Sequence, residues 1–363
     1  MGQPVNVGVV GCGAISAQYF RTIDRLPELR LVAVADLDLD RAREAVRPYA
    51  GVDVLSVAEL LADSRIDIVL NLTIPAAHAE IALQAIAAGK DVYCEKPLAA
   101  TAEQAAGMLR AAGAAQVRVG CAPDTVLGTG TQTARKAIDD GLIGRPIAAT
   151  ATMMTPGHER WHPNPDFYYV PGGGPLLDMG PYYVTSLVTL LGPVESVVGA
   201  ASRTRAKRTI GSGPRQGEEI PVTVDTHVTG VLVHTSGALS TLVMSFDGAA
   251  TKSPNIEVHG EAGSLVVPDP NYFDGSVLIS GVGEGEWRTL PVAAGYVEGG
   301  RGVGLADFAA TPAGEEPRTS GSLAFHVLDV MESLLASAHS GAAVTITSTC
   351  ERPSPVNLTQ PTD

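Results

Sequence analysis

The sequence predicts an α/β protein: a doubly wound parallel sheet at the amino terminus, followed by an α+β domain with a mostly antiparallel, open sheet. Over residues 1–122, apolar runs alternate with helical patterns, which is typical of a parallel sheet covered by helices on both faces. Between residues 194 and 280, β-like runs follow one another. The 363 residues can bury two separate cores. We predict domains at 1–122 and 123–346, and a polar tail at 347–363 that lies in solvent.

The elements follow from β-branched runs, which predict strands, and from helix signals such as Gly89 after one helix and the capping Thr101 before the next. In the first domain we predict strands near 5–10, 31–35, 52–55, 66–70, 91–94 and 117–119, and helices near 14–25, 38–48, 57–61, 76–88 and 101–112. In the second we predict helices near 125–140, 177–191 and 322–338, and strands near 145–154, 194–201, 222–234, 238–246, 255–259, 264–267 and 276–280. Residues at the carboxyl ends of the parallel strands should face one ligand cleft.

The first strand leads into a turn that suits a dinucleotide. Gly11 permits a tight turn, and Gly13 lets the backbone approach a pyrophosphate. The helix that begins near Ala14 and Ile15 offers free N–H groups to the phosphates. Asp36, at the end of the second strand, stands where a carboxylate accepts hydrogen bonds from the adenosine ribose. The pattern predicts a dinucleotide-binding Rossmann domain; an ordinary strand–turn–helix with small residues is the alternative interpretation.

The residues around Asp36 bear on the choice of cofactor. Leu37 and Asp38 follow it, where an arginine would pair with the 2′-phosphate of NADP. We therefore predict NAD. Arg41 and Arg43 lie a few positions further on and keep NADP possible.

Composition and charge exclude several classes of protein. Apolar residues make up 45% of the chain and charged residues 18%, which is typical of a globular protein. The net charge of −14 would repel a phosphate polymer, so we expect no nucleic-acid partner, and we interpret the basic run at 203–208 as a solvated strand end or loop.

The four cysteines form no Cys-x-x-Cys pair, which favours free thiols in a reducing compartment. With no leader pattern and no run of about 18 apolar residues, we expect a cytoplasmic protein with no membrane partner.

Three further segments carry more specific patterns. Residues 71–78 read Asn-Leu-Thr-Ile-Pro-Ala-Ala-His, residues 87–98 contain Glu95-Lys96-Pro97, and residues 172–180 read Gly-Gly-Gly-Pro-Leu-Leu-Asp-Met-Gly. Together with the glycine turn they resemble the glucose–fructose oxidoreductase, inositol dehydrogenase and MocA (Gfo/Idh/MocA) family, over about residues 5–338. The resemblance implies a Rossmann domain, a carboxy-terminal α/β domain with an open sheet, and NAD(P)-dependent oxidation or reduction of sugar or cyclitol hydroxyls.

Lys96 is the first predicted catalytic residue. It follows a strand, beside Pro97, and its ammonium can hydrogen-bond a substrate hydroxyl and favour the alkoxide that forms during oxidation. The alternative is a surface lysine at a turn. His78 is expected near the nicotinamide, or else in a packing role at the start of a helix. The residues predicted to contact the cofactor are Gly11, Gly13, Ala14, Ile15, Asp36, Thr73, Pro75, His78, Glu95 and Lys96.

Asp178 and Tyr182 are the other predicted catalytic residues, and their spacing places them on one face of a helix. The resemblance implies a histidine at the position of Tyr182, so this chain departs from the family pattern there. A phenol close to Lys96 could serve as the base; Tyr182 could instead orient the substrate or pack on the helix. Asp178 would orient the substrate hydroxyl or Lys96.

The loop before this helix is rich in aromatic and polar groups, which suits recognition of a sugar. Trp161 would cover a ring face, and His158 or His162 would bind hydroxyls or supply the imidazole that Tyr182 lacks. The two histidines also suggest a metal pair, but no third ligand is evident, so we predict no metal. A lid loop without a catalytic role is the alternative. The predicted substrate-binding residues are His158, Trp161, His162, Asp124 and Tyr183, with a charge at a helix start as the other interpretation of Asp124.

The sequence therefore predicts an enzyme: a dehydrogenase that transfers a hydride between NAD(P) and a secondary hydroxyl of a sugar, a sugar derivative or a cyclitol. One alternative is an enzyme that uses bound NAD transiently to cleave a glycosidic bond. Another is a non-catalytic sensor that binds NAD. An uncovered face of the second sheet would suit a homodimer or homotetramer.

Overall fold

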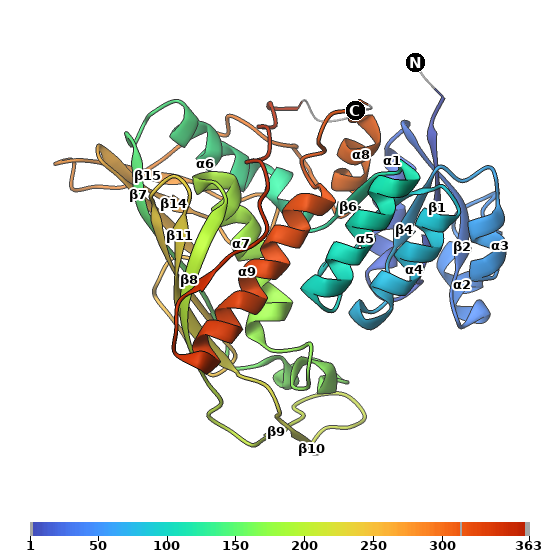
Figure 1. Ribbon diagram of the computed structural model, residues 1–363, viewed down its shortest axis with the longest axis horizontal. Coiled ribbons are helices and arrows are strands. Elements are labelled where there is room, and N and C mark those ends of the chain that lie inside the picture. Colours follow the sequence, from blue (N-terminus) through green and yellow to red (C-terminus); the bar gives the residue numbers. More distant parts are fainter. Residues whose placement is uncertain (1–2, 313, 360–363) are drawn as a thin grey trace. The chain divides into compact units, whose positions relative to one another are not determined.

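The chain divides into two compact units in the computed structural model, which describes residues 3–312 and 314–359 (Figure 1). Unit 1 comprises Met1–Leu127 and Gly299–Phe325, and unit 2 comprises Gly128–Glu298 and His326–Asp363. The first boundary therefore lies a few residues beyond the predicted one. Unit 1 also includes a segment from much later in the chain, which the sequence analysis assigned to the second domain.

Unit 1 contains a six-stranded parallel sheet in the order β3-β2-β1-β4-β5-β6. Its strands are β1 (Val5–Val10), β2 (Leu29–Ala35), β3 (Asp53–Val54), β4 (Ile68–Asn71), β5 (Asp91–Cys94) and β6 (Val119–Cys121). Its helices are α1 (Ser16–Arg25), α2 (Leu39–Val46), α3 (Val57–Ala62), α4 (Pro75–Ala87), α5 (Ala102–Ala115), the 3-10 helix η1 (Asp124–Leu127) and α8 (Val303–Ala310). The strand order changes direction between β1 and β4, the point where ligands of doubly wound sheets bind. The predicted fold class is confirmed.

The returning segment completes unit 1 around a buried carboxylate. One oxygen of Asp124 accepts hydrogen bonds from the backbone N–H groups of Gly302, at 2.7 Å, and Gly304, at 3.2 Å. The other lies 3.6 Å from the Arg301 guanidinium. Helix α8, which the sequence analysis did not predict, is thereby held next to η1.

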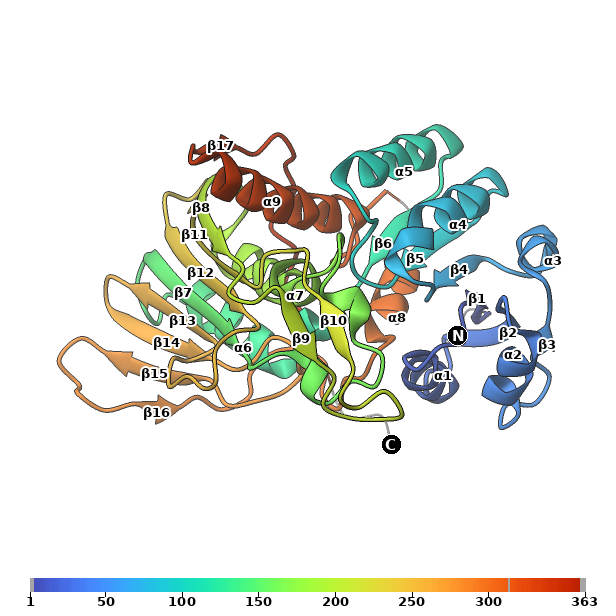
Figure 2. The ribbon, with the colours of Figure 1, turned by 90° about the horizontal axis from the view of Figure 1, so that it is seen from below.

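Unit 2 contains a nine-stranded sheet in the order β16-β15-β14-β13-β7-β12-β11-β8-β17, in which only β7 and β12, among the described strands, pair in parallel. These strands are β7 (Pro146–Met154), β8 (Val194–Ser202), β11 (His227–His234), β12 (Leu239–Ser245), β13 (Ile256–Gly260), β14 (Gly263–Val267), β15 (Leu278–Gly281), β16 (Arg288–Thr289) and β17 (Val344–Thr345). Strands β9 (Lys207–Thr209) and β10 (Glu219–Pro221) form a separate hairpin. Helices α6 (Thr129–Asp139), α7 (Pro175–Leu191) and the carboxyl-terminal part of α9 (Gly321–Ser340) lie on one face of the large sheet (Figures 1 and 2).

Residues 347–359, the described part of the tail, pack on unit 2, although the tail was predicted to lie in solvent. Arg352 donates to the backbone oxygens of Thr189, at 2.8 Å, and Leu190, at 3.0 Å, in the last turn of α7. The Val356 side chain is buried, and its backbone N–H donates to Gln132 Oε1 at 2.9 Å. A guanidinium at the end of α7 satisfies carbonyls that have no partner within the helix, which explains why a polar tail is ordered there.

His234 makes the stability of unit 2 depend on pH. It is fully buried, its Nδ1 lies 2.7 Å from the Gly192 oxygen, and its Nε2 lies 2.7 Å from Ser240 Oγ, so the neutral Nδ1–H tautomer satisfies both nitrogens. Burial holds the pKa of His234 below its ordinary value. Because only the unfolded chain takes up a proton there below about pH 6.5, this stabilisation is present above that pH and is lost as the pH falls.

We expect the free energy of unfolding to decrease more for the wild-type chain than for His234→Gln between about pH 7.5 and about pH 5.5, by about 1 kcal/mol. Urea unfolding at the two pH values measures the difference. The same pH dependence in both proteins would contradict this origin of acid sensitivity.

Candidate active site

The turn after β1 is shaped for a close ligand. Gly11 has a φ of +103°, and a Cβ there would lie 2.7 Å from the Leu72 carbonyl carbon, so only glycine fits. A Cβ added to Gly13 would meet no heavy atom of the described structure within 4 Å. Among the described residues, no side chain caps the start of α1, just after Ala14 and Ile15. The open turn at Gly13 and the positive end of the α1 dipole fit the negatively charged pyrophosphate of a dinucleotide.

Asp36 faces the same turn from the end of β2. Its carboxylate accepts from the Cys12 N–H at 2.7 Å and from the Asp38 N–H at 2.9 Å, and it pairs with Arg41 at 3.4 Å. These contacts fix the carboxylate where the ribose hydroxyls of NAD would bind. Burial, with a smaller effect of Asp36, raises the pKa of the Cys12 thiol to about 12, so this cysteine stays protonated and inert.

His78 lies between the residues that follow β4 and those that follow β5. Its Nδ1 lies 2.6 Å from the Pro97 oxygen, and its Nε2 lies 3.0 Å from the Thr73 oxygen. The side chain is fully buried, so the geometry supports its packing role rather than contact with the nicotinamide. Pro75 occupies the first turn of α4. Burial lowers the pKa of His78, and the neutral ring has one N–H, so it donates to one of these oxygens and packs against the other.

Glu95 and Lys96 lie at the end of β5, and both side chains are partly buried. Glu95 accepts from the Tyr19 hydroxyl at 2.8 Å through one carboxylate oxygen, and from the Lys96 backbone N–H at 2.9 Å through the other. The Glu95 carboxylate therefore holds the end of β5 in place through these two hydrogen bonds. It holds the backbone that carries the Lys96 ammonium.

Asp124 was predicted to bind substrate, and its contacts point to the alternative. The side chain is fully buried among backbone amides of the returning segment, and burial raises its pKa. A carboxylate enclosed in this way stabilises the start of α8. The structure thus offers no support for Asp124 as a substrate ligand.

Unit 2 brings His158 and Asp178 together. Asp178 lies in the first turn of α7, and its Oδ2 is 3.2 Å from His158 Nε2 in the 3-10 helix η2 (His158–Arg160). Both side chains are largely but not fully buried. A carboxylate at this distance requires the proton on Nε2, which leaves the lone pair on Nδ1. That Nδ1 is buried with no hydrogen-bond partner among the described residues.

Aromatic side chains surround His158. Its ring centroid lies 4.4 Å from that of Phe246, 4.8 Å from Tyr168 and 5.2 Å from Trp161. Trp161 is 59% exposed and presents an indole face that could stack on a sugar ring. His162 lies further out, edge-on to Trp161, and its Nδ1 accepts from the Asn164 N–H at 3.1 Å. Of the two loop histidines, only His158 contacts Asp178.

Tyr182 and Tyr183 lie in the middle of α7 and are both buried. The Tyr183 hydroxyl accepts from Asn255 Nδ2 at 2.8 Å and donates to Asp269 at 3.4 Å, and burial raises its pKa. Tyr183 therefore anchors α7 to the sheet side of unit 2, and these contacts do not support its predicted role in substrate binding. Tyr182 follows Asp178 by one helical turn and stays a predicted catalytic residue.

The sequence analysis missed a buried ion network beside His158. Arg208 in β9 is 1% exposed and pairs with Glu159 at 2.9 Å and with Asp247. The sequence analysis had interpreted the basic run at 203–208, which includes Arg208, as solvated. Tyr169 donates a short hydrogen bond to Glu159. Neither carboxylate is near Arg208 in sequence, so no local pattern indicated that this arginine is buried.

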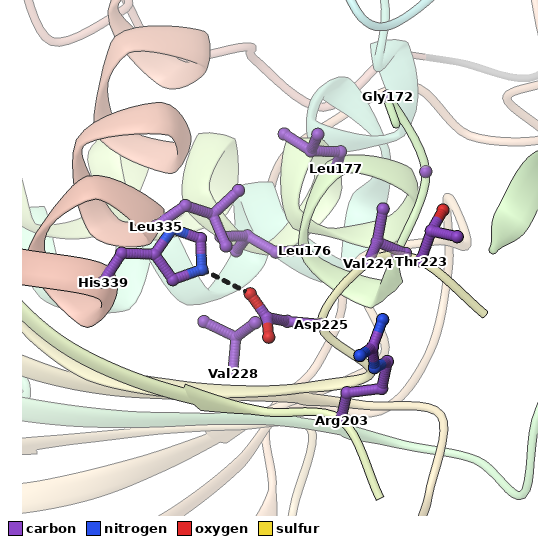
Figure 3. A pocket seen from close by; sticks show the side chains of 12 residues that line it. Gly172, Leu176, Leu177, Arg203, Thr223, Val224, Asp225, Val228, Leu335 and His339 are labelled. Carbon is purple, nitrogen blue, oxygen red and sulfur yellow. Dashed lines mark hydrogen bonds and ion pairs between the residues drawn. The ribbon is translucent and has the colours of Figure 1, made fainter. Parts of the chain in front are cut away.

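A cavity of about 400 Å³ lies beside the start of α7 (Figure 3). Asp225 and His339 contact each other at 2.6 Å, Arg203 lies on another wall, and Leu176 and Leu335 contribute apolar surface. None of the predicted substrate-binding residues is among the described residues that line it. The cavity is therefore separate from the predicted site. Among residues 3–312 and 314–359, no cluster of histidine, cysteine and carboxylate side chains could hold a metal ion.

The fold and the nucleotide turn define an NAD-binding oxidoreductase, and comparisons identify its family. Residues 5–122 match the family described as "Oxidoreductase family, NAD-binding Rossmann fold", and residues 131–266 match the "GFO/IDH/MocA C-terminal domain". The chain is 31% identical to the 1,5-anhydro-D-fructose reductase of Ensifer adhaerens over 71% of this chain and 74% of that protein. The chain therefore belongs to the Gfo/Idh/MocA family.

Other relatives agree with this assignment. The inositol 2-dehydrogenase of Burkholderia cenocepacia is 37% identical over 39% of this chain and 44% of its own length. Among solved structures, an NAD-binding oxidoreductase from Klebsiella pneumoniae superimposes with a TM-score of 0.82 and 24% identity, and covers 96% of this chain and 100% of its own. A levoglucosan dehydrogenase in complex with NADH and L-sorbose superimposes with a TM-score of 0.79 at 23% identity, over 96% of this chain and 100% of its own. The predicted NAD-dependent oxidoreductase is confirmed as a class.

Asp36 should control the choice between NAD and NADP. In Asp36→Ser, the ribose loses its acceptor and Arg41 is released to meet a 2′-phosphate. We expect the Kd for NAD to rise about 10-fold or more and the Kd for NADP to fall relative to it. Titration calorimetry with both nucleotides measures this, and Asp40→Ser, which removes an exposed carboxylate of α2, is the control. An unchanged ratio of the two Kd values would contradict the role of Asp36.

Proposed function

We propose that this oxidoreductase acts on a secondary hydroxyl of a sugar, a sugar derivative or a cyclitol, with NAD as its redox partner. The names of its relatives support this substrate class, since they include a 1,5-anhydro-D-fructose reductase and inositol 2-dehydrogenases. When bound, NAD accepts the hydride that leaves the substrate carbon. The protein must then hold the substrate, accept its hydroxyl proton and stabilise the charge on its oxygen.

The observation that carries the proposal is the unsatisfied Nδ1 of His158. Buried polar atoms without partners are rare in folded proteins and are often found where a ligand binds. Asp178 accepts from Nε2–H, which directs the basic lone pair to Nδ1 and stabilises the imidazolium once a proton arrives. We assign His158 as the base that takes the hydroxyl proton of the substrate. His158 thus supplies an imidazole in place of the histidine that the family pattern has at position 182, where this chain has tyrosine.

Lys96 and Tyr182 have supporting roles in this proposal. The Lys96 ammonium, on a turn fixed by Glu95 and packed against His78, stabilises the negative charge on the substrate oxygen as the proton leaves. The phenol of Tyr182 orients the substrate from the same helix as Asp178. Trp161 covers a ring face, and His162 binds a hydroxyl at the outer edge.

A panel of sugars and cyclitols with NAD tests the function. The purified chain should reduce NAD with at least one polyol of the panel and should release the matching ketone. Product analysis beside nicotinamide absorbance separates this reaction from its alternatives. Glycoside cleavage without net NADH would indicate the transient-redox enzyme, and binding of NADH without turnover of any substrate would indicate a sensor.

His158→Gln should lower kcat about 100-fold, because it removes the base, and should leave the Kd for NADH unchanged. His259→Gln, in strand β13, is the matched control and should keep the wild-type rate. Tyr182→Phe decides between the two candidate bases. If kcat falls more in Tyr182→Phe than in His158→Gln, the phenol is the base and our assignment is wrong.

We also propose that two or more copies associate through the open face of the large sheet. Val198 and Val231 are opposite each other in β8 and β11 and are 50% and 37% exposed. Leu239 in β12, which pairs with Val233 and so lies on the same face as Val231, is 48% exposed. A homodimer or homotetramer would bury this apolar surface, and analytical ultracentrifugation measures its mass.

The proposed location is the cytoplasm. The four cysteines are free thiols, which suits a reducing compartment. None of the helices in the described part of the chain combines the length and the apolar character needed to cross a bilayer. The net charge of −14 agrees with a partner that is a neutral small molecule rather than a nucleic acid.

A further inference from the structure

Arg208 links several segments of unit 2 that are far apart in the sequence. Its Nη1 donates to the Pro156 oxygen at 3.0 Å and to Glu159 Oε1 at 2.9 Å. Its Nη2 donates to the Phe246 oxygen at 2.9 Å and to the Asp247 carboxylate. Each terminal nitrogen of the guanidinium thus binds one backbone oxygen and one carboxylate. A lysine ammonium, as a single point donor, cannot reproduce this fork.

These acceptors enclose His158. Pro156 precedes it by two residues and Glu159 follows it directly, while the Phe246 ring packs against the imidazole at 4.4 Å. Arg208 therefore binds Pro156 on one side of His158 in the sequence, Glu159 on the other side, and the backbone of Phe246, whose ring packs against the imidazole. The imidazole has little freedom to leave Asp178 while these bonds hold.

The backbone next to His158 is packed directly against the network. Gly157 has a φ of +110°, and a Cβ there would lie 2.2 Å from Glu159 Oε2 and 2.6 Å from Arg208 Nη1. No larger residue fits between the arginine and the loop. Any shift of the guanidinium is therefore transmitted to the peptide that carries the imidazole.

The remaining groups of the network hold the two carboxylates in place. Tyr169 donates to Glu159, and Thr226 Oγ1 donates to Asp247 Oδ2 at 2.7 Å. Burying ions is expensive, and a buried pair often adds little net stability compared with apolar packing. What such a network can provide is one defined arrangement of the segments that it joins, and here those segments surround His158.

We propose that Arg208 is the positioning residue that holds His158 at hydrogen-bond distance from Asp178. The proposal rests on the assignment of His158 as the base. The Arg208 side chain is 1% exposed, so in this proposal it acts through Pro156, Glu159 and Phe246 and not by contact with cofactor or substrate.

The test compares Arg208→Lys with wild type in the full-length protein. The lysine keeps the buried positive charge, so the chain should fold, but it cannot hold both backbone oxygens and both carboxylates. We expect kcat to fall about 10-fold to 100-fold, as small misplacements of reacting groups do, with no change in the Kd for NADH. The apparent pKa of the base in the pH profile of kcat should also move, which a merely structural role would not cause.

Lys207→Met is the matched control, because Lys207 precedes Arg208 in β9 and its pair with Glu219 is exposed. It should keep the wild-type kcat and pH profile. Tyr169→Phe is a milder second variant, which removes one hydrogen bond to Glu159 and retains the charge pair. It should give a smaller change in the same direction, and it tests the proposal if Arg208→Lys does not fold.

A readout without turnover separates this proposal from the proposed function. In protein labelled with ¹³C-histidine, the His158 resonance, assigned with His158→Gln, should shift in Arg208→Lys and Tyr169→Phe and stay in place in Lys207→Met. A folded Arg208→Lys or Tyr169→Phe protein with a wild-type His158 resonance, kcat and pH profile would overturn the role of Arg208. A wild-type chain that binds NADH but turns over no polyol would overturn the proposed function, and the resonance would still report on Arg208.

Discussion

The contact between His158 and Asp178 is the interaction on which the chemistry that we propose for unit 2 depends. One partner lies in a loop with little regular structure, and the other lies in the first turn of a long, buried helix. A loop of this kind keeps a fixed geometry only if its neighbours restrain it. The aromatic rings around the imidazole and the buried ions behind it supply that restraint. The carboxylate in turn fixes which ring nitrogen carries the proton.

Unit 1 could be predicted well because its signals are local. The strands of the parallel sheet are mostly apolar, and the turn after β1 combines a glycine that no other residue could replace with an acid that directly follows the next strand. The carboxylate of Asp36 lies at that turn as expected. Roles for side chains were less predictable: His78 lies beside the predicted turn, but both of its ring nitrogens contact backbone oxygens.

The features that sequence reasoning missed all depend on distant partners. Arg208 belongs to a run of basic residues that resembles a solvated surface, and it is buried because Glu159 and Asp247 compensate its charge. Arg352 is ordered in a polar tail because helix carbonyls accept from it. Asp124 precedes a helix, as a capping charge would, yet it serves a different helix much later in the chain. No periodicity or motif encodes such pairings.

The late completion of unit 1 has a consequence for how the protein is made. Asp124 and Gly302 are 178 residues apart, so the ribosome releases the carboxylate long before the amides that receive it. A buried carboxylate without compensation is unfavourable, and the pocket that encloses it therefore stays open to water during most of translation. The enclosure of Asp124 is complete only after strands β7 to β16 of unit 2 have been synthesised, whereas β17 of the same sheet is made later. Folding of the two units is thus interleaved in time, although each has its own core.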